Sequence, residues 1–203
     1  DGDKYPLEIT CNWDCVKDLK EYIYKTMLQK DPIQNALAII ETYIGKTYNQ
    51  DSGTLRTDTT EKALEQMDCS ELVCRFLQLA CGLDYVPNQT TAKFAEIVDK
   101  GDNEYVQFID GSEQNTHTDI KPGDIFLWRK EGGPGHVGVV KEYSNDVVTV
   151  IEAISSSGSA EESIQESGTC KGCVRQSKYT RTGNALKDHK GWKGYFRPII
   201  NTK

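Results

Sequence analysis

The period of the hydrophobic pattern changes about halfway along the chain, and this change limits the possible folds more than any other feature. In the first half, apolar residues recur at spacings of three and four, as in amphipathic helices. In the second half, short runs of β-branched and aromatic residues alternate with turn residues, as in strands. Helices are expected over 13–30, 32–44 and 69–81, with a short one capped by Thr91, and strands over 125–128, 136–140, 147–153, 173–176 and 195–200. This order predicts an α+β fold, with helices packed on one face of an antiparallel β-sheet.

Length and charge narrow the class of protein. The 203 residues suffice for one domain with an extension, and we expect a helical extension over 1–35 and a single domain over 36–203. With 31 acidic and 24 basic residues the formal charge is −7, which disfavours nucleic acid or an anionic membrane surface as a partner. No apolar run approaches the roughly 18 residues of a membrane helix, so we expect no membrane insertion. We expect a monomer.

The seven cysteines bear on the compartment and on metal binding. The chain opens with polar residues, so the protein is either cytosolic or exported with its leader removed, and we favour export. In an exported protein an odd number of cysteines leaves at least one thiol unpaired. Cys170 and Cys173 are expected in a disulfide, with each other or with Cys11 and Cys15. The alternative is that these four bind zinc; we favour the disulfide and expect no metal and no cofactor.

Cys69 is the candidate nucleophile. Residues 68–82 read DCSELVCRFLQLACG, and their apolar members form one broad helical face. Asp68 is a good N-cap, and Glu71 three residues later suggests a capping box, so Cys69 is expected at the first helical position. There the helix dipole and unpaired N–H groups stabilise a thiolate and can bind an oxyanion. The alternative is a small buried apolar residue, as we expect for the two later cysteines of this helix.

A cysteine nucleophile needs a base, for which the chain offers His117, His136 and His189. His117 and His189 lie in polar segments and are expected at the surface. His136 follows a turn rich in glycine and proline and begins a strand, so its side chain can face a cleft while the following residues are fixed in the sheet. A lone histidine in a strand is more often structural, so this assignment needs a partner residue.

Glu152 is the candidate partner of His136. Residues 142–146 suit a hairpin turn. A hairpin centred on Ser144 would place Glu152 directly opposite His136, on the same face of the sheet. Glu152 would then accept a hydrogen bond from Nδ1, which leaves Nε2 as the base. A register shift of one residue would instead send Glu152 to the other face, as an ordinary polar residue at a strand end.

These residues belong to motifs whose order is informative. A Gly-x-x-Tyr segment at 45–48 precedes Asp-Cys-Ser at 68–70, and IKPGDIF at 120–126, GHVGVV at 135–140 and GYFRPII at 194–200 follow. In this order, over roughly residues 36–200, the chain resembles NlpC-type papain-like cysteine peptidases. Two features depart from that pattern. Glu71 stands where the family usually has glycine, and a glutamate as third residue is more similar to the related CHAP amidases.

The resemblance implies a papain-like fold and hydrolysis of peptidoglycan stem peptides, commonly at a D-glutamyl-diamino acid bond. It implies Cys69 as nucleophile, His136 as base and Glu152 as the residue that orients the histidine. It also places three further residues near the amino-terminal end of the stem peptide: Tyr48, Asp68 and Ser70. The alternatives are a CHAP-like or effector-type amidase, or a non-catalytic module that binds wall peptides. The presence of all three catalytic candidates argues against the last.

Overall fold

The computed structural model describes seven segments of the chain: 31–50, 65–83, 90–101, 104–110, 120–156, 170–180 and 190–200. Nearly all of them belong to the larger of the two units into which the chain divides, Pro32–Lys203. The helix predicted over 13–30 lies outside the described residues, and the boundary predicted after residue 35 stays a prediction. Among the described helices, none is long and apolar enough to cross a membrane.

The helices follow the predicted apolar faces, with small differences at their ends. The described helices are α2 (Pro32–Glu41), α3 (Cys69–Cys81) and α4 (Thr91–Lys100). Helix α2 buries Ala36, Leu37 and Ile40 as expected, but it ends at Glu41, and Ile44 is exposed. The cap predicted for α4 is wrong by one residue, because the Thr90 hydroxyl accepts the hydrogen bond from the Lys93 N–H and Thr91 is the first helical residue.

The strands form one sheet in the order β2-β1-β7-β6-β5-β4-β8-β3. Its members are β1 (Thr47–Tyr48), β2 (Gln66–Met67), β3 (Val106–Asp110), β4 (Ile125–Arg129), β5 (Gly135–Ser144), β6 (Val147–Ile154), β7 (Cys173–Thr180) and β8 (Trp192–Pro198). Neighbouring strands are antiparallel except for the parallel pair β1 and β2. The five predicted strands are present, and the α+β fold with an antiparallel-dominated sheet is confirmed. Strands β1, β2 and β3 were not predicted. Strands β1 and β2 have two residues each, too few to show an alternating pattern, and β3 has only five.

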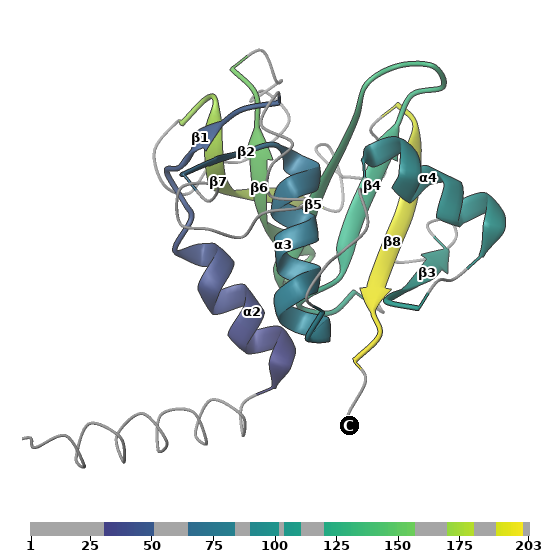
Figure 1. Cartoon of the computed structure of the whole chain (residues 1–203), viewed down its shortest axis with the longest axis horizontal. Coiled ribbons are helices and arrows are strands. Elements are labelled where there is room, and N and C mark those ends of the chain that lie inside the picture. Colours follow the sequence, from purple (N-terminus) through teal and green to yellow (C-terminus); the bar gives the residue numbers. More distant parts are fainter. Residues whose placement is uncertain are drawn as a thin grey trace, which may run out of the picture. The chain divides into compact units, whose positions relative to one another are not determined.

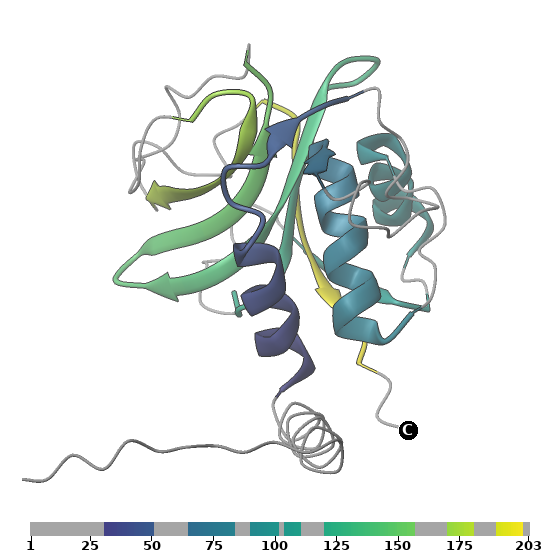
Figure 2. The same cartoon turned by 60° about the vertical axis from the view of Figure 1, so that its left-hand side comes forward.

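The sheet separates two apolar clusters. Helices α2, α3 and α4 lie on the same side of it, as Figures 1 and 2 show. Ile125 and Leu127 of β4 face these helices, while Phe126 between them packs on the opposite face with Val140 and Tyr179. This alternation is the period of two that identified the strand in the sequence.

The motif at 120–126 has a structural role. The Asp124 carboxylate is buried and accepts two hydrogen bonds from the Arg197 guanidinium, each 2.8 Å long, which ties the start of β4 to β8. Gly123 has a φ of +90°, and a Cβ added there would lie 2.5 Å from Cγ2 of Ile33. This glycine therefore permits both the turn and the close approach of α2.

The register predicted for the β5–β6 hairpin is wrong. The turn residues are Asn145 and Asp146, with φ of 50° and 61°, and Ser144 pairs with Val147. Two residues with positive φ are the usual requirement of a two-residue hairpin turn whose twist matches the strands. The hairpin is therefore centred between Asn145 and Asp146 and not on Ser144.

A β-bulge then changes the register once more. It lies between Val140 and Glu142, so that Val139 pairs with Ile151. The bulge residue Lys141 directs its ammonium to Glu41 of α2 and to Gln176 of β7. If this register continues by one residue beyond Val139 and Ile151, Gly138 lies opposite Glu152. His136 was predicted at that place. The difference from the predicted register is two residues, so Glu152 keeps the predicted face.

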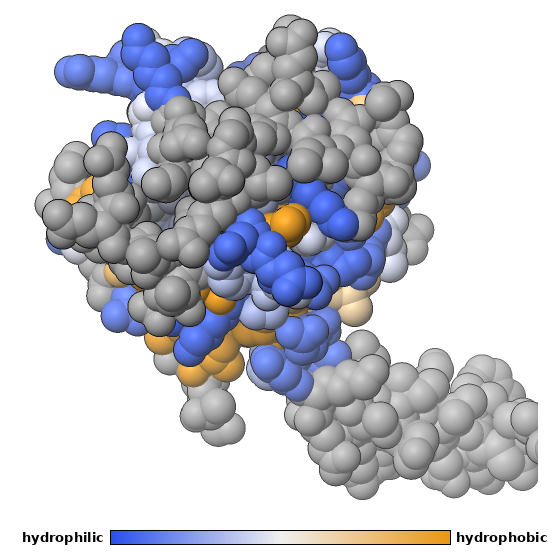
Figure 3. Space-filling model, turned by 180° about the vertical axis from the view of Figure 1, so that it is seen from behind, coloured by the Kyte–Doolittle hydropathy of each residue, from blue (hydrophilic) through white to orange (hydrophobic). Residues whose placement is uncertain are grey.

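Hydrophilic residues dominate the described surface on the face seen from behind, with hydrophobic ones only in small patches (Figure 3). Among the described residues, Ile44 is the only large hydrophobic side chain that is exposed. The predicted monomeric state stays a prediction.

Candidate active site

Cys69 occupies the first position of α3, as the sequence predicts. The Asp68 carboxylate accepts hydrogen bonds from the Glu71 N–H at 2.8 Å and from the Ser70 hydroxyl at 2.7 Å. The Glu71 carboxylate in turn accepts from the Asp68 N–H at 2.9 Å, which completes the capping box. These side chains are all buried. The start of α3, and with it the Cys69 thiol, is therefore held from several directions.

His136 and Glu152 are in contact, as predicted, but through the other ring nitrogen. Nε2 of His136 lies 2.9 Å from Oε2 of Glu152, and Cys69 is near enough to interact electrostatically with the imidazole. Because Nε2 is engaged by Glu152, Nδ1 is the nitrogen available to Cys69. The predicted assignment, with Nε2 as the base, is thus reversed. Its cause is the diagonal placement of His136 and Glu152 across Gly138, in place of the directly opposed pair that was predicted.

Gly138 makes this diagonal contact possible. A Cβ added to Gly138 would lie 2.5 Å from the Phe126 ring and 3.1 Å from Cβ of Glu152. The His136 ring itself packs between Phe126 and Trp128, with ring centroids 5.6 and 6.0 Å away. The absent side chain at 138 leaves room in which the Glu152 carboxylate reaches His136.

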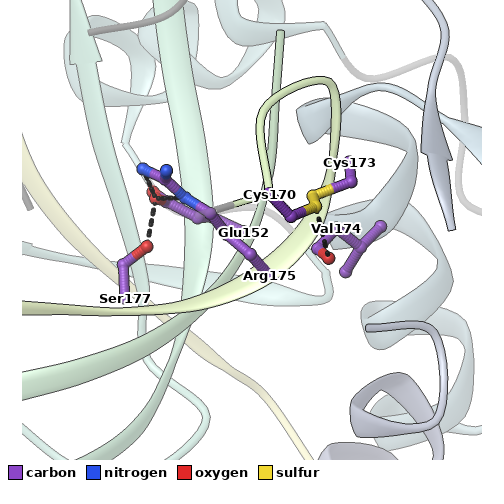
Figure 4. Close-up of a disulfide and its surroundings, with 6 residues drawn as sticks. All are labelled: Glu152, Cys170, Cys173, Val174, Arg175 and Ser177. Atoms are coloured by element: carbon purple, nitrogen blue, oxygen red, sulfur yellow. Dashed lines mark hydrogen bonds and ion pairs between the residues drawn. A yellow bond between two sulfur atoms is a disulfide. The ribbon is translucent and has the colours of Figure 1, made fainter. Parts of the chain in front are cut away.

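Strand β7 contributes residues that sequence reasoning missed. Ser177 donates a hydrogen bond to Glu152 at 2.6 Å, and the Arg175 guanidinium donates two, at 3.0 and 3.1 Å (Figure 4). The Tyr179 hydroxyl donates another, at 3.0 Å. Arg175 is almost fully buried and pairs with Glu152 across the β6–β7 ladder. Every second residue of β7 thus faces the carboxylate. The alternation was visible in the sequence, but the pairing of β6 with β7 was not.

The protonation states of His136 and Glu152 follow from this environment. Burial alone would favour the neutral forms, lowering the pKa of His136 and raising that of Glu152. Hydrogen bonds and charges outweigh it: Cys69 and Glu152 raise the pKa of His136 well above its ordinary value. The contacts with His136, Arg175 and Ser177 likewise bring the pKa of Glu152 below its own. At neutral pH the pair is an imidazolium beside a carboxylate, and an imidazolium next to a cysteine stabilises a thiolate.

Cys69 opens onto a cavity of about 440 Å³. The three residues predicted to bind substrate, Tyr48, Asp68 and Ser70, line it. The other residues of the lining are Gln50, Thr90, Thr91, Ala92, Arg129, Gly133, Pro134 and Gly135. Burial, followed by the charges of Cys69, Asp68 and Glu71, raises the pKa of Tyr48 far above its ordinary value. The Tyr48 phenol therefore remains a hydrogen-bond donor at the cavity.

The remaining cysteines fall into two groups. Among the described cysteines, Cys69, Cys74 and Cys81 are free thiols, while Cys170 and Cys173 form a disulfide, the first of the predicted alternatives. A disulfide pair does not supply the two thiolates that the zinc hypothesis needs. The histidines expected at the surface, His117 and His189, lie outside the described residues, as do Cys11 and Cys15.

Comparison with known proteins agrees with these motifs. Residues 59–153 match the model of the CHAP domain. The solved structures of NlpC1 and NlpC2 from Trichomonas vaginalis are similar over 82% of this chain, at 16% and 15% identity and a TM-score of 0.44 each. The similarity covers 44% and 46% of those chains, so this chain spans less than half of their length. No curated protein matches the sequence. The CHAP match covers a little less than half of the chain, includes Cys69, His136 and Glu152, and supports the expected resemblance to cell-wall peptidases of the NlpC and CHAP type.

Proposed function

We propose that this protein is a thiol hydrolase of peptidoglycan stem peptides. The observation that carries the proposal is the placement of Cys69, at the N-terminus of α3, near His136, which in turn contacts the buried Glu152. A nucleophile, a base and a residue that orients the base are the parts of a cysteine hydrolase site. The cavity beside Cys69 has room for a peptide segment.

The geometry supports the following reaction. The Cys69 thiolate attacks the carbonyl carbon of the scissile bond, and N–H groups at the start of α3 stabilise the oxyanion that forms. The His136 imidazolium gives its proton to the leaving amine as the carbon–nitrogen bond breaks, which leaves a thioester on Cys69. The neutral imidazole then takes a proton from water, and the hydroxide attacks the thioester. The acid product departs, and the thiolate and the imidazolium are restored.

The bond that we propose is the one between D-glutamate and the diamino acid of the stem. Tyr48, Asp68 and Ser70 line the cavity on the Cys69 side, where they can bind the amino-terminal part of the peptide. The Asp68 carboxylate also holds the start of α3, so its role in binding is combined with a structural one. We further propose export, which is supported by the Cys170–Cys173 disulfide, because such bonds persist in oxidising compartments.

Mass spectrometry of purified muropeptides after incubation tests the proposal. An endopeptidase gives fragments cut within the stem, whereas an amidase of the CHAP or effector type releases the whole stem from the glycan. The Cys69→Ala variant, incubated in parallel, should give neither product. Absence of any product with the wild-type protein, together with retention of the peptides, would instead favour a non-catalytic binding module.

A further inference from the structure

Arg129, at the end of β4, is a cation in the wall of the cavity that contains Cys69. Its guanidinium donates a hydrogen bond to the Thr91 hydroxyl, with Nη1 2.7 Å from Oγ1. Among the described residues it has no carboxylate partner, in contrast to Arg175 and Arg197. A half-buried guanidinium that has no counter-ion in the described part of the chain, beside a nucleophile, is suited to bind an anion of the substrate.

The position of Arg129 is fixed by close packing. Thr91 is buried in the first turn of α4. A Cβ added to Gly135 would lie 2.9 Å from the Thr91 hydroxyl and 3.0 Å from the Trp128 carbonyl. Gly135 thus allows β5 to approach the start of α4, and Thr91 holds the guanidinium there. A cation fixed in this way loses little side-chain entropy when it binds a ligand.

Charges of both signs lie around the cavity. The carboxylate of Asp68 is occupied by the N–H of Glu71 and the hydroxyl of Ser70. The first residues of α4 also line the cavity, so the positive end of its dipole adds to the charge of Arg129. The part of the cavity formed by Arg129 and the start of α4 is therefore positive, while the carboxylate of Asp68 contributes a negative charge elsewhere in the lining.

We propose that Arg129 binds a free carboxylate of the stem peptide and makes the site selective for acidic over amidated peptides. The inference rests on the proposed function. When D-glutamate is linked through its side-chain carbonyl, its α-carboxylate remains free and close to the scissile bond. Amidation of this carboxylate removes the charge but hardly changes the shape, so the amidated peptide is a matched neutral substrate.

The test compares L-alanyl-γ-D-glutamyl-diaminopimelate with its α-amidated form, using the wild type and Arg129→Gln. For the acidic peptide, Arg129→Gln should lower kcat/KM by roughly 10- to 100-fold, mainly through KM, because a charge-assisted hydrogen bond is lost. For the amidated peptide the same change should be less than about threefold. Arg129→Lys should restore part of the preference for the acidic peptide.

Lys130→Gln is the matched control, since it removes a neighbouring, exposed charge that does not line this cavity. Equal losses on both peptides in Arg129→Gln would assign the residue a purely structural role and overturn the inference, as would no loss on either. If the wild type cleaves neither peptide, the proposed function fails. The affinities of Cys69→Ala and Cys69→Ala/Arg129→Gln for the two peptides, measured by calorimetry, then still decide the role of Arg129.

Discussion

At the scale of single residues, the position of Cys69 distinguishes it from the other free thiols. Cys69 begins α3 beside an imidazolium, whereas Cys74 lies fully buried within the same helix. Cys69→Ala should therefore lower hydrolysis by about 10⁴-fold or more while the melting temperature is kept. Cys74→Ala, as its control, should keep the activity per folded molecule and cost about 1 kcal/mol of stability. Substantial turnover in Cys69→Ala would exclude the mechanism.

Glu152 should set the pH range of activity through His136. Its charge helps to keep the pKa of His136 raised, so the imidazolium persists to high pH and activity falls as the pH rises through that pKa. In Glu152→Gln the carboxamide oxygen can still accept from Nε2, but the charge is lost. The alkaline limb of kcat should therefore move to lower pH. Glu152→Ala should be less active than Glu152→Gln. Its rate should lie roughly 10²–10⁴-fold below that of the wild type. An unchanged pH profile in both variants would contradict this role.

A second substitution, at Arg175, separates the effect of Glu152 on the pH profile from its effect on stability. Loss of the Glu152 charge removes the ion pair of this carboxylate with the buried guanidinium of Arg175, which should cost about 3–5 kcal/mol of stability. In Glu152→Gln/Arg175→Met much of this stability should return, while the shifted pH profile should remain. Urea unfolding and pH–rate measurements on the same preparations separate the two effects.

Sequence reasoning identified the three candidate catalytic residues but not the contacts that define their states. Cys69 could be predicted as the first helical residue because its capping box is local in the sequence. The surroundings of Glu152 could not be predicted, because Arg175, Ser177 and Tyr179 reach it through a pairing of strands that no local pattern specifies. The same holds for Arg129, whose partner Thr91 is 38 residues away in the chain.

At the scale of elements, the β5–β6 hairpin shows which part of a register can be predicted. The turn-forming composition of 142–146 correctly indicated a hairpin. Its centre depended on which two residues adopt positive φ, and the bulge depended on contacts of Lys141 with α2 and β7. The contacts of Lys141 are tertiary contacts, which no local pattern specifies. The sequence could therefore predict that Glu152 and His136 share a face of the sheet, but not which residues lie directly opposite each other.

The turn itself can be tested by substitution. Asn145 has a φ of 50°, a region that β-branched side chains strongly disfavour. Asn145→Val should therefore destabilise the protein by about 1–2 kcal/mol. Ser144→Val places the same side chain on the neighbouring exposed residue of β5, where an extended backbone accepts it, and should be nearly neutral. Equal melting temperatures for the two variants would show that the turn does not need this conformation.

At the scale of the whole molecule, strand β1 connects the disulfide to the cavity. The Tyr48 N–H donates to the Gly172 carbonyl, and Val174 exchanges two hydrogen bonds with the segment before Tyr48, each of these bonds 2.8 Å long. Gly172 lies within the loop that the Cys170–Cys173 disulfide closes. The wall of the cavity that carries Tyr48 is therefore held by a loop more than a hundred residues later in the chain.

Removal of this disulfide should consequently weaken substrate binding more than it slows the chemical step. Cys170→Ala should destabilise the protein by about 2 kcal/mol, since the closed loop is short. KM should rise several-fold because Tyr48 is less firmly placed, whereas kcat should change little because Cys69, His136 and Glu152 lie on α3, β5 and β6. Cys81→Ala, which removes a free thiol outside the cavity lining, is the control and should leave KM unchanged. A fall in kcat at constant KM would show that the disulfide acts on the catalytic residues themselves, through β7 and Arg175, and not through Tyr48.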